Sequence, residues 1–237
     1  MQEETRGLAD ALTELALLSA DPFDVAELLH LATDRAREVL RSDGSLVLLS
    51  VDGDGLHPAG ASGNVGDVDA ILATEGVPCR RSLLTGEVVS FDAEHAADEF
   101  PDYAALAAAG GIKRVLSAPL KRGDSVLGTL SVARGDARDF DEDDVAAIRQ
   151  LADVVTSSLV RERTLREALA VTAQLEHALQ ARVVIEQAKG MVAAELKITV
   201  DEALDRIRRF TRSRQLRLAD VAGDIVARSL AVADLSQ

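Results

Sequence analysis

Two stretches near the carboxyl end of the chain carry basic side chains at helical spacing. Arg182 and Lys189 are seven residues apart, so both fall on one line of a helix, and Gly190 removes a side chain beside Lys189. A second helix sets its apolar residues opposite four arginines: Arg206, Arg208, Arg209 and Arg212. Arg214 and Arg217 follow. Because guanidinium groups bind phosphates bidentately and stack on unpaired bases, this pattern indicates a surface for a phosphate-bearing polymer.

Other interpretations of these basic residues stay open. An arginine-rich helix face is often only a solvated surface, and Glu186 lies one helical turn from both Arg182 and Lys189, where it could pair with either. Aromatic residues make up 3% of the chain, with no Trp and one Tyr, so bases would find few rings to stack on. With Phe210 on the apolar side of its helix, arginine planes are the expected substitutes.

Charge is distributed unevenly along the 237 residues. The net charge of −14 at first argues against nucleic acid, because phosphates attract positive surfaces. Residues 1–160 carry 13 Lys and Arg against 29 Asp and Glu, whereas residues 182–217 carry 9 against 5. An acidic front and a basic rear predict two modules, of which only the rear could face phosphates.

No other group of side chains points to catalysis or to a metal. The single cysteine, Cys79, excludes a disulfide framework and fits a reducing compartment, and Arg80 and Arg81 beside it could lower its thiol pKa. The four histidines are scattered without partners at metal or triad spacing. The acidic run 139–144 is expected to cap a helix rather than bind calcium. We therefore expect a protein that is not an enzyme, with no catalytic residue and no metal; its cofactor, if any, stays unknown.

The front module is expected to contain several helices. The first covers about residues 3–18. A second begins with Asp21 as its cap and Pro22 in its first position, and its apolar residues recur until Gly44 stops the run. Small residues predict a further helix around 103–109.

Two predicted β-hairpins complete this module. The first pairs 45–51 with 56–62 through the turn 52–55, and the second pairs 114–120 with 125–133. Pro119 tends to place its strand at an edge of the sheet or near its own end. Helices around two hairpins predict an α+β fold built on an antiparallel sheet.

A long helix is expected over about 145–195, since the sequence has no Pro and no Gly before Gly190. Its first part would pack on the sheet. Its middle continues with apolar residues at irregular spacing: Leu165, Leu169, Leu175, Leu179 and Val183. Such a helix is too long to be buried in so small a domain. Either it breaks near 161–166, or its middle pairs with a second chain like a coiled coil; we predict the homodimer.

The rear module is expected to be an all-α unit of three helices. Thr199 and Glu202 form a capping-box pattern at the start of its second helix. That helix gathers apolar side chains on one side, and a third helix covers about residues 218–232. Three short helices of this kind must pack together to bury their apolar faces.

The rear residues resemble the ANTAR family of bacterial RNA-binding antitermination domains. The resemblance covers about the last 60 residues and is most specific in the stretch Arg182–Gly190; Thr211 departs from it, because the family usually has a small apolar residue there. It implies binding of RNA stem-loops through the following residues: Arg182, Gln187, Lys189, Gly190, Arg206, Arg208, Arg209, Arg212 and Arg214.

The front residues are similar to GAF sensor domains over about 20–160. Motifs spread along the module carry the similarity: the helix 22–41, the strand 45–51, Glu75–Cys79, Thr85–Val88, Ser117–Leu120 and Val126–Val132. The similarity implies a ligand pocket with Cys79 at its wall, with redox sensing or bilin attachment as alternatives for that thiol. The expected divisions are an N-terminal helix (1–20), a GAF-like domain (21–160), a helical linker (161–180) and an ANTAR domain (176–237).

Together, the two resemblances imply a homodimeric, signal-responsive regulator that binds hairpins in nascent transcripts and blocks terminator formation. A DNA-binding regulator is the main alternative, although the helix 218–232 carries only Arg228 against Asp220 and Asp224. A signalling scaffold or a ligand-binding enzyme using the front module alone is a third class. No apolar stretch approaches the roughly 18 residues that cross a bilayer, so a cytoplasmic protein is expected. The signal, the transcripts and the direction of control stay open.

Overall fold

The computed structural model describes residues 2–20, 23–50, 55–93, 95 and 98–236. Contacts divide the chain into two compact units, residues 1–164 and residues 165–237. Each unit is described by itself. Within the described residues, no helix combines the length and the apolar composition that crossing a membrane requires.

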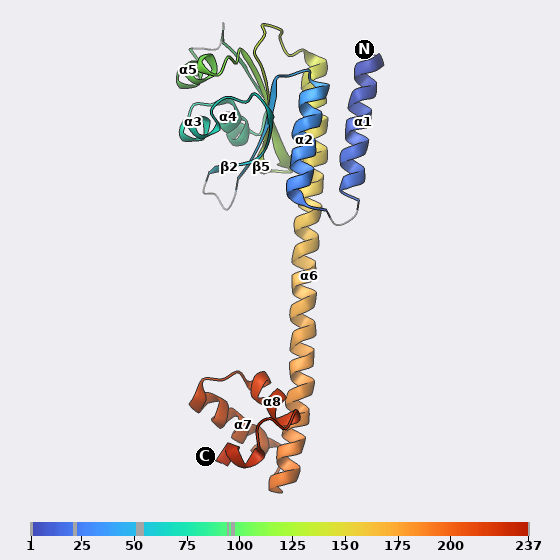
Figure 1. Cartoon of the computed structure of the whole chain (residues 1–237), viewed down its shortest axis with the longest axis vertical. Coiled ribbons are helices and arrows are strands. Elements are labelled where there is room, and N and C mark those ends of the chain that lie inside the picture. Colours follow the sequence, from blue (N-terminus) through green and yellow to red (C-terminus); the bar gives the residue numbers. More distant parts are fainter. Residues whose placement is uncertain (1, 21–22, 51–54, 94, 96–97, 237) are drawn as a thin grey trace. The chain divides into compact units, whose positions relative to one another are not determined.

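The first unit is built on a five-stranded antiparallel sheet (Figure 1). Its strands are β1 (Gly44–Ser50), β2 (Leu56–Gly63), β3 (Val89–Asp92), β4 (Arg114–Arg122) and β5 (Ser125–Arg134), in the order β2-β1-β5-β4-β3. Both predicted hairpins are confirmed, as β1–β2 and β4–β5. The predicted turn between β1 and β2 lies mostly outside the described residues.

Helices cover both faces of this sheet (Figure 1). On one face lie α1 (Gln2–Leu18), α2 (Val25–Val39) and the first part of α6 (Glu142–Leu196). On the other face lie α3 (Val68–Ala73), α4 (Pro78–Thr85) and α5 (Pro101–Ala109). Side chains alternate along β4, so Leu116 and Ala118 enter the first core whereas Val115 enters the second. The predicted α+β class is confirmed.

Two local expectations need comment. The predicted start of the second helix is wrong: Asp21 and Pro22 lie outside the described residues, and the helix begins at Val25, where the Asp24 side chain accepts a hydrogen bond from the Ala26 amide at 2.8 Å. Pro119 sits inside the sheet order rather than on an edge strand. It lies near the end of β4, past the segment Arg114–Ser117 that pairs with β3, so its missing N–H is tolerated.

The second unit packs the last part of α6 against α7 (Val200–Arg214), α8 (Leu218–Val226) and a 3₁₀ helix (Val232–Ser236). The long helix is confirmed, and its 55 residues run without the break near 161–166 that the sequence left open. The predicted third helix is too long. It ends at Val226 because Arg228 adopts φ +59°, after which the Ser229 amide and hydroxyl bond to the Asp224 carbonyl at 2.9 and 3.1 Å.

Candidate nucleic-acid interface and sensor cavity

The capping box fixes where α7 begins and therefore which way its arginines face. Thr199 Oγ1 accepts from the Glu202 amide at 3.2 Å, and the Glu202 carboxylate accepts from the Thr199 amide at 2.8 Å. These hydrogen bonds hold the pKa of Glu202 below its usual value. Downstream, Ala203, Ile207 and Phe210 are buried against α6 and α8. The opposite side of the helix is thereby turned to solvent.

The arginines of α7 do not form a single face. Three are exposed on the polar side: Arg208, Arg209 and Arg212. Arg206 is half-buried. Arg214 is exposed but lies on the side of Phe210, with its guanidinium carbon 3.9 Å from the ring centroid. Arg214 therefore does not extend the polar face of the helix, because one helical turn places it over Phe210.

The last part of α6 contributes a second group of predicted contact residues. Ala188 and Val192 are buried, which leaves Arg182, Gln187 and Gly190 exposed. A side chain at Gly190 would meet open space, so nothing in the described chain requires a glycine there. Lys189 donates to both carboxylate oxygens of Glu186 at 3.0 and 2.9 Å, and its side chain is only 12% exposed. The alternative pairing with Glu186 is therefore realised for Lys189.

The first unit holds a small cavity between the sheet and α3, α4 and α5. Its volume is about 30 Å³, room for a water molecule or two but well below the roughly 300 Å³ of a usual ligand pocket. Every side chain that lines it is uncharged: Leu46, Val65, Ile71, Pro78, Cys79, Tyr103, Val115, Ser117, Ser131, Val132 and Ala133. The Ser117 and Ser131 hydroxyls bond to each other at 2.8 Å on its floor.

Burial governs the chemistry of this cavity. The pKa of the Cys79 thiol is raised to about 11, mainly because burial disfavours the thiolate. The possibility that Arg80 and Arg81 lower this pKa is not realised, since desolvation outweighs the charge of Arg80. Burial also raises the pKa of Tyr103. Cys79 is thus a neutral wall residue at physiological pH.

This state of Cys79 can be measured. At neutral pH a thiol of pKa about 11 holds about a hundredfold less thiolate than one of pKa about 9, and thiolate is the form that reacts. We expect iodoacetamide to alkylate Cys79 in the native protein at least a hundredfold more slowly than in urea, followed by mass spectrometry. Native alkylation within tenfold of the unfolded rate would contradict the buried neutral thiol.

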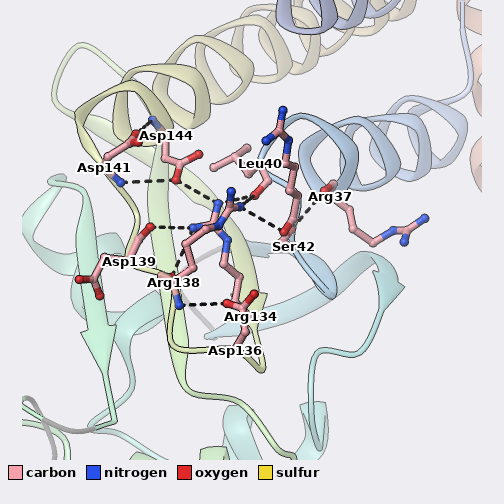
Figure 2. A network of polar contacts seen from close by, with 10 residues as sticks. Arg37, Leu40, Ser42, Arg134, Asp136, Arg138, Asp139, Asp141 and Asp144 are labelled. Atoms are coloured by element: carbon pink, nitrogen blue, oxygen red, sulfur yellow. Dashed lines mark hydrogen bonds and ion pairs between the residues drawn. The ribbon is translucent and has the colours of Figure 1, made fainter. Parts of the chain in front are cut away.

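A polar network joins the sheet to the start of α6 within the first unit (Figure 2). Arg134, at the end of β5, is 1% exposed and donates to the Leu40 carbonyl, to the Asp139 carbonyl at 2.9 Å and to the Asp144 carboxylate at 3.0 Å. Its guanidinium also lies 3.8 Å from the Phe140 ring centroid. Burial lowers the pKa of Arg134 and the Asp144 carboxylate opposes that shift. The ends of α2, β5 and α6 are therefore tied through one side chain.

The acidic run 139–144 supplies a carboxylate to this network and caps the start of α6. Asp141 Oδ1 accepts from the Asp144 amide at 2.9 Å, which is the N-terminal capping expected from the sequence. Asp139 pairs with Arg114 at 2.8 Å. Within the described residues, no three His, Cys, Asp or Glu side chains gather as a metal site would require. Sequence reasoning missed Arg134; the signal was a lone arginine closing an apolar strand a few residues before an acidic run.

Solved structures share the fold of the front unit. The phycoerythrobilin-bound GAF domain of a cyanobacterial phytochrome has a TM-score of 0.58 at 14% identity, over 68% of this chain and 99% of that one. The free methionine-R-sulfoxide reductase of Neisseria meningitidis, in complex with its substrate, reaches 0.54 at 18% identity, over 67% and 91%. The GAF domain of a Coxiella burnetii phosphoenolpyruvate-protein phosphotransferase reaches 0.52 at 16%, over 68% and 98%. At these identities the similarity shows the fold alone. No curated protein matches the chain significantly.

The fold is thus that of a GAF sensor domain, and the sequence agrees. Residues 24–160 match the GAF domain family and residues 173–226 match the ANTAR domain, which confirms both resemblances. The chain belongs to the GAF domain family and carries an ANTAR domain after it. GAF domains sense small molecules and ANTAR domains are RNA-binding antitermination modules, so this architecture fits a sensor-controlled regulator. Both domains are typically non-enzymatic, although the reductase above is an enzyme.

Proposed function

We propose that this protein is a homodimeric RNA-binding regulator that controls transcription by antitermination on hairpins in nascent transcripts. The observation that carries the proposal is the exposed trio Arg208, Arg209 and Arg212 on a helix of the ANTAR domain. Guanidinium groups match phosphate geometry, and RNA loops offer phosphates and splayed bases together. The protein would act without catalysis and in the cytoplasm, where nascent bacterial transcripts are.

The proposed RNA-contacting set keeps every residue predicted from the sequence, with different roles. Arg208, Arg209 and Arg212 supply the phosphate contacts. Lys189 is bound to Glu186 and must exchange that partner to reach a phosphate. The remaining members of the set lie on α6 and α7: Arg182, Gln187, Gly190, Arg206 and Arg214.

The homodimer is supported by the middle of α6. Six large apolar side chains there are 44–64% exposed: Leu165, Leu169, Val171, Leu175, Leu179 and Val183. A helix with an exposed apolar row gains stability by pairing with a second copy, and pairing presents two RNA-binding domains to two hairpins on one transcript. We assign the pairing of the two chains to the helical linker (161–180). The proposed divisions around it are an N-terminal helix (1–20), a sensor domain (21–160) and an ANTAR domain (176–237).

The sensor domain is proposed to control this pairing. A ligand or a protein partner that shifts the sheet would displace the end of β5, and the Arg134 network ties that end to the first turn of α6. Occupancy would then bias the equilibrium between competent and incompetent dimers. Cys79 is proposed as a wall residue of the sensor cavity.

A DNA-binding regulator is disfavoured by α8. A recognition helix needs basic and polar side chains toward the groove, yet Leu218–Val226 carries Asp220 and Asp224 and no Lys or Arg. Arg228 lies beyond the end of the helix.

The proposal is tested by selection and charge reversal. The full chain is first used to select hairpins from a stem-loop RNA library with randomised loops, against duplex DNA at the same salt. We expect Arg208→Glu with Arg209→Glu to weaken binding of the selected hairpin on the order of a hundredfold, because two charge-assisted contacts are lost. Fluorescence anisotropy gives the affinity and circular dichroism the helix content.

The matched control reverses two exposed arginines of the first unit, Arg122→Glu with Arg149→Glu, and should leave RNA affinity within twofold. The proposed function fails if no hairpin is enriched over duplex DNA, or if both double variants weaken binding equally.

A further inference from the structure

Arg214 occupies a position unlike that of the other arginines of α7. It lies in the last turn of the helix, its side chain is exposed, and its guanidinium carbon is 3.9 Å from the centroid of the Phe210 ring. Phe210 itself is only 8% exposed and belongs to the core of the second unit. In the described part of the chain, no hydrogen bond or ion pair engages the Arg214 guanidinium.

This arrangement holds a flat cation in place. The ring holds one face of the guanidinium, since a cation over an aromatic face is attracted by its quadrupole, and core side chains pack around Phe210. The opposite face of the guanidinium is turned away from the ring. Ordering this long side chain in the free protein removes part of the entropic cost of a later contact.

A restrained flat cation suits a base better than a phosphate. A phosphate contact uses the N–H groups at the guanidinium edge, which the exposed Arg208 and Arg212 present equally well. A base instead stacks on the guanidinium plane, and the chain has few exposed rings to offer in its place.

We propose that Arg214, backed by Phe210, is the stacking platform for one looped-out base of the RNA hairpin, and so determines recognition of the loop rather than of the stem. This assignment rests on the RNA-binding function proposed above. Arg212 differs from Arg214 in lying away from the ring, so it contributes charge without a restrained plane.

The test compares two substitutions that keep the charge. Arg214→Lys removes the plane and is expected to weaken binding of the selected hairpin about tenfold or more, the usual range for losing one base stack. Arg228→Lys, at an exposed arginine of the same unit that lies outside the proposed contact set, is expected to change it less than twofold. The salt dependence of the affinity should be the same for both variants and the wild type, since no charge is lost. Thermal melting checks that the Phe210 core stays intact.

Loop-base dependence separates stacking from a structural role. Each loop nucleotide of the hairpin is replaced in turn by an abasic one. For the wild type, the abasic nucleotide at one loop position should lower the affinity for the hairpin about tenfold. For Arg214→Lys the same replacement should lower the affinity almost no further, because the stacked pair is already broken. Equal losses for the two lysine variants, or abasic losses that simply add to that of Arg214→Lys, would overturn the assignment while leaving RNA binding in place. Absence of any selected hairpin would instead sink the proposed function.

Discussion

Replacing Arg134 by methionine is expected to destabilise the first unit by about 3 kcal/mol or more. The side chain is 1% exposed and ties the Leu40 carbonyl, the Asp139 carbonyl and the Asp144 carboxylate together. Removing one partner of a buried ion pair typically costs about 3–5 kcal/mol, because the other group is left without compensation. The lower end applies here since the Asp144 side chain remains 19% exposed and regains some hydration.

Urea unfolding followed by far-ultraviolet circular dichroism measures this effect, since the chain has no Trp whose fluorescence could be followed. We expect the transition of the first unit to move to lower urea while that of the second unit stays in place, which requires treating the two transitions separately. Arg138→Met is the matched control. Arg138 is exposed and reaches the same Leu40 carbonyl at 3.2 Å, so its loss should cost under about 1 kcal/mol. If the two variants lowered the free energy of unfolding equally, the buried ion pair and hydrogen bonds of Arg134 would not stabilise the first unit as argued.

The elements that local pattern determines were predictable. Alternating apolar residues around short turns placed both hairpins, and Thr199 with Glu202 placed the start of α7, because hairpins and capping boxes are specified by neighbours in sequence. Motif likeness likewise gave the two domains that the family matches confirm. The start of α2 was misplaced because two aspartates compete to cap it, and the nearer one, Asp24, does so.

The features that depend on distant contacts were not predictable. The tie between Leu40 and Asp144 joins residues 104 positions apart, and the local signal at Arg134, a lone arginine closing an apolar strand, does not say which distant groups it binds. The thiol pKa of Cys79 depends on distant contacts for the same reason: adjacent arginines in sequence left a lowered pKa open, whereas burial in the second core raises it. On α7, the helical wheel correctly opposed Arg208, Arg209 and Arg212 to the core. The spacing of Phe210 and Arg214 makes them neighbours, yet it could not show that the guanidinium stacks on the ring instead of extending into solvent.

Placing two glutamates in the apolar row of α6 is expected to abolish dimerisation. Leu175 and Leu179 are 61% and 64% exposed in the single chain and four residues apart, so they lie on one face. Leu175→Glu with Leu179→Glu would bring four carboxylates together at the seam of a paired helix, where desolvation and like-charge repulsion both oppose association. The molar mass measured by light scattering after size-exclusion chromatography should fall from that of two chains to that of one.

The RNA readout of the same variant has the larger expected effect. Linking two binding modules raises overall affinity by about 10² to 10⁴, so a transcript with two hairpins should lose about that much on monomerisation, whereas one isolated hairpin should bind as before. Ala170→Glu with Gln174→Glu is the matched control, because these exposed residues carry the same added charge on the opposite face of α6. If this control also becomes monomeric, or if the seam variant stays dimeric and binds both transcripts normally, the leucine row is not the dimer interface. If instead the seam variant is monomeric but loses the single hairpin too, pairing supports the fold of the RNA-binding domain itself, and avidity is not its role.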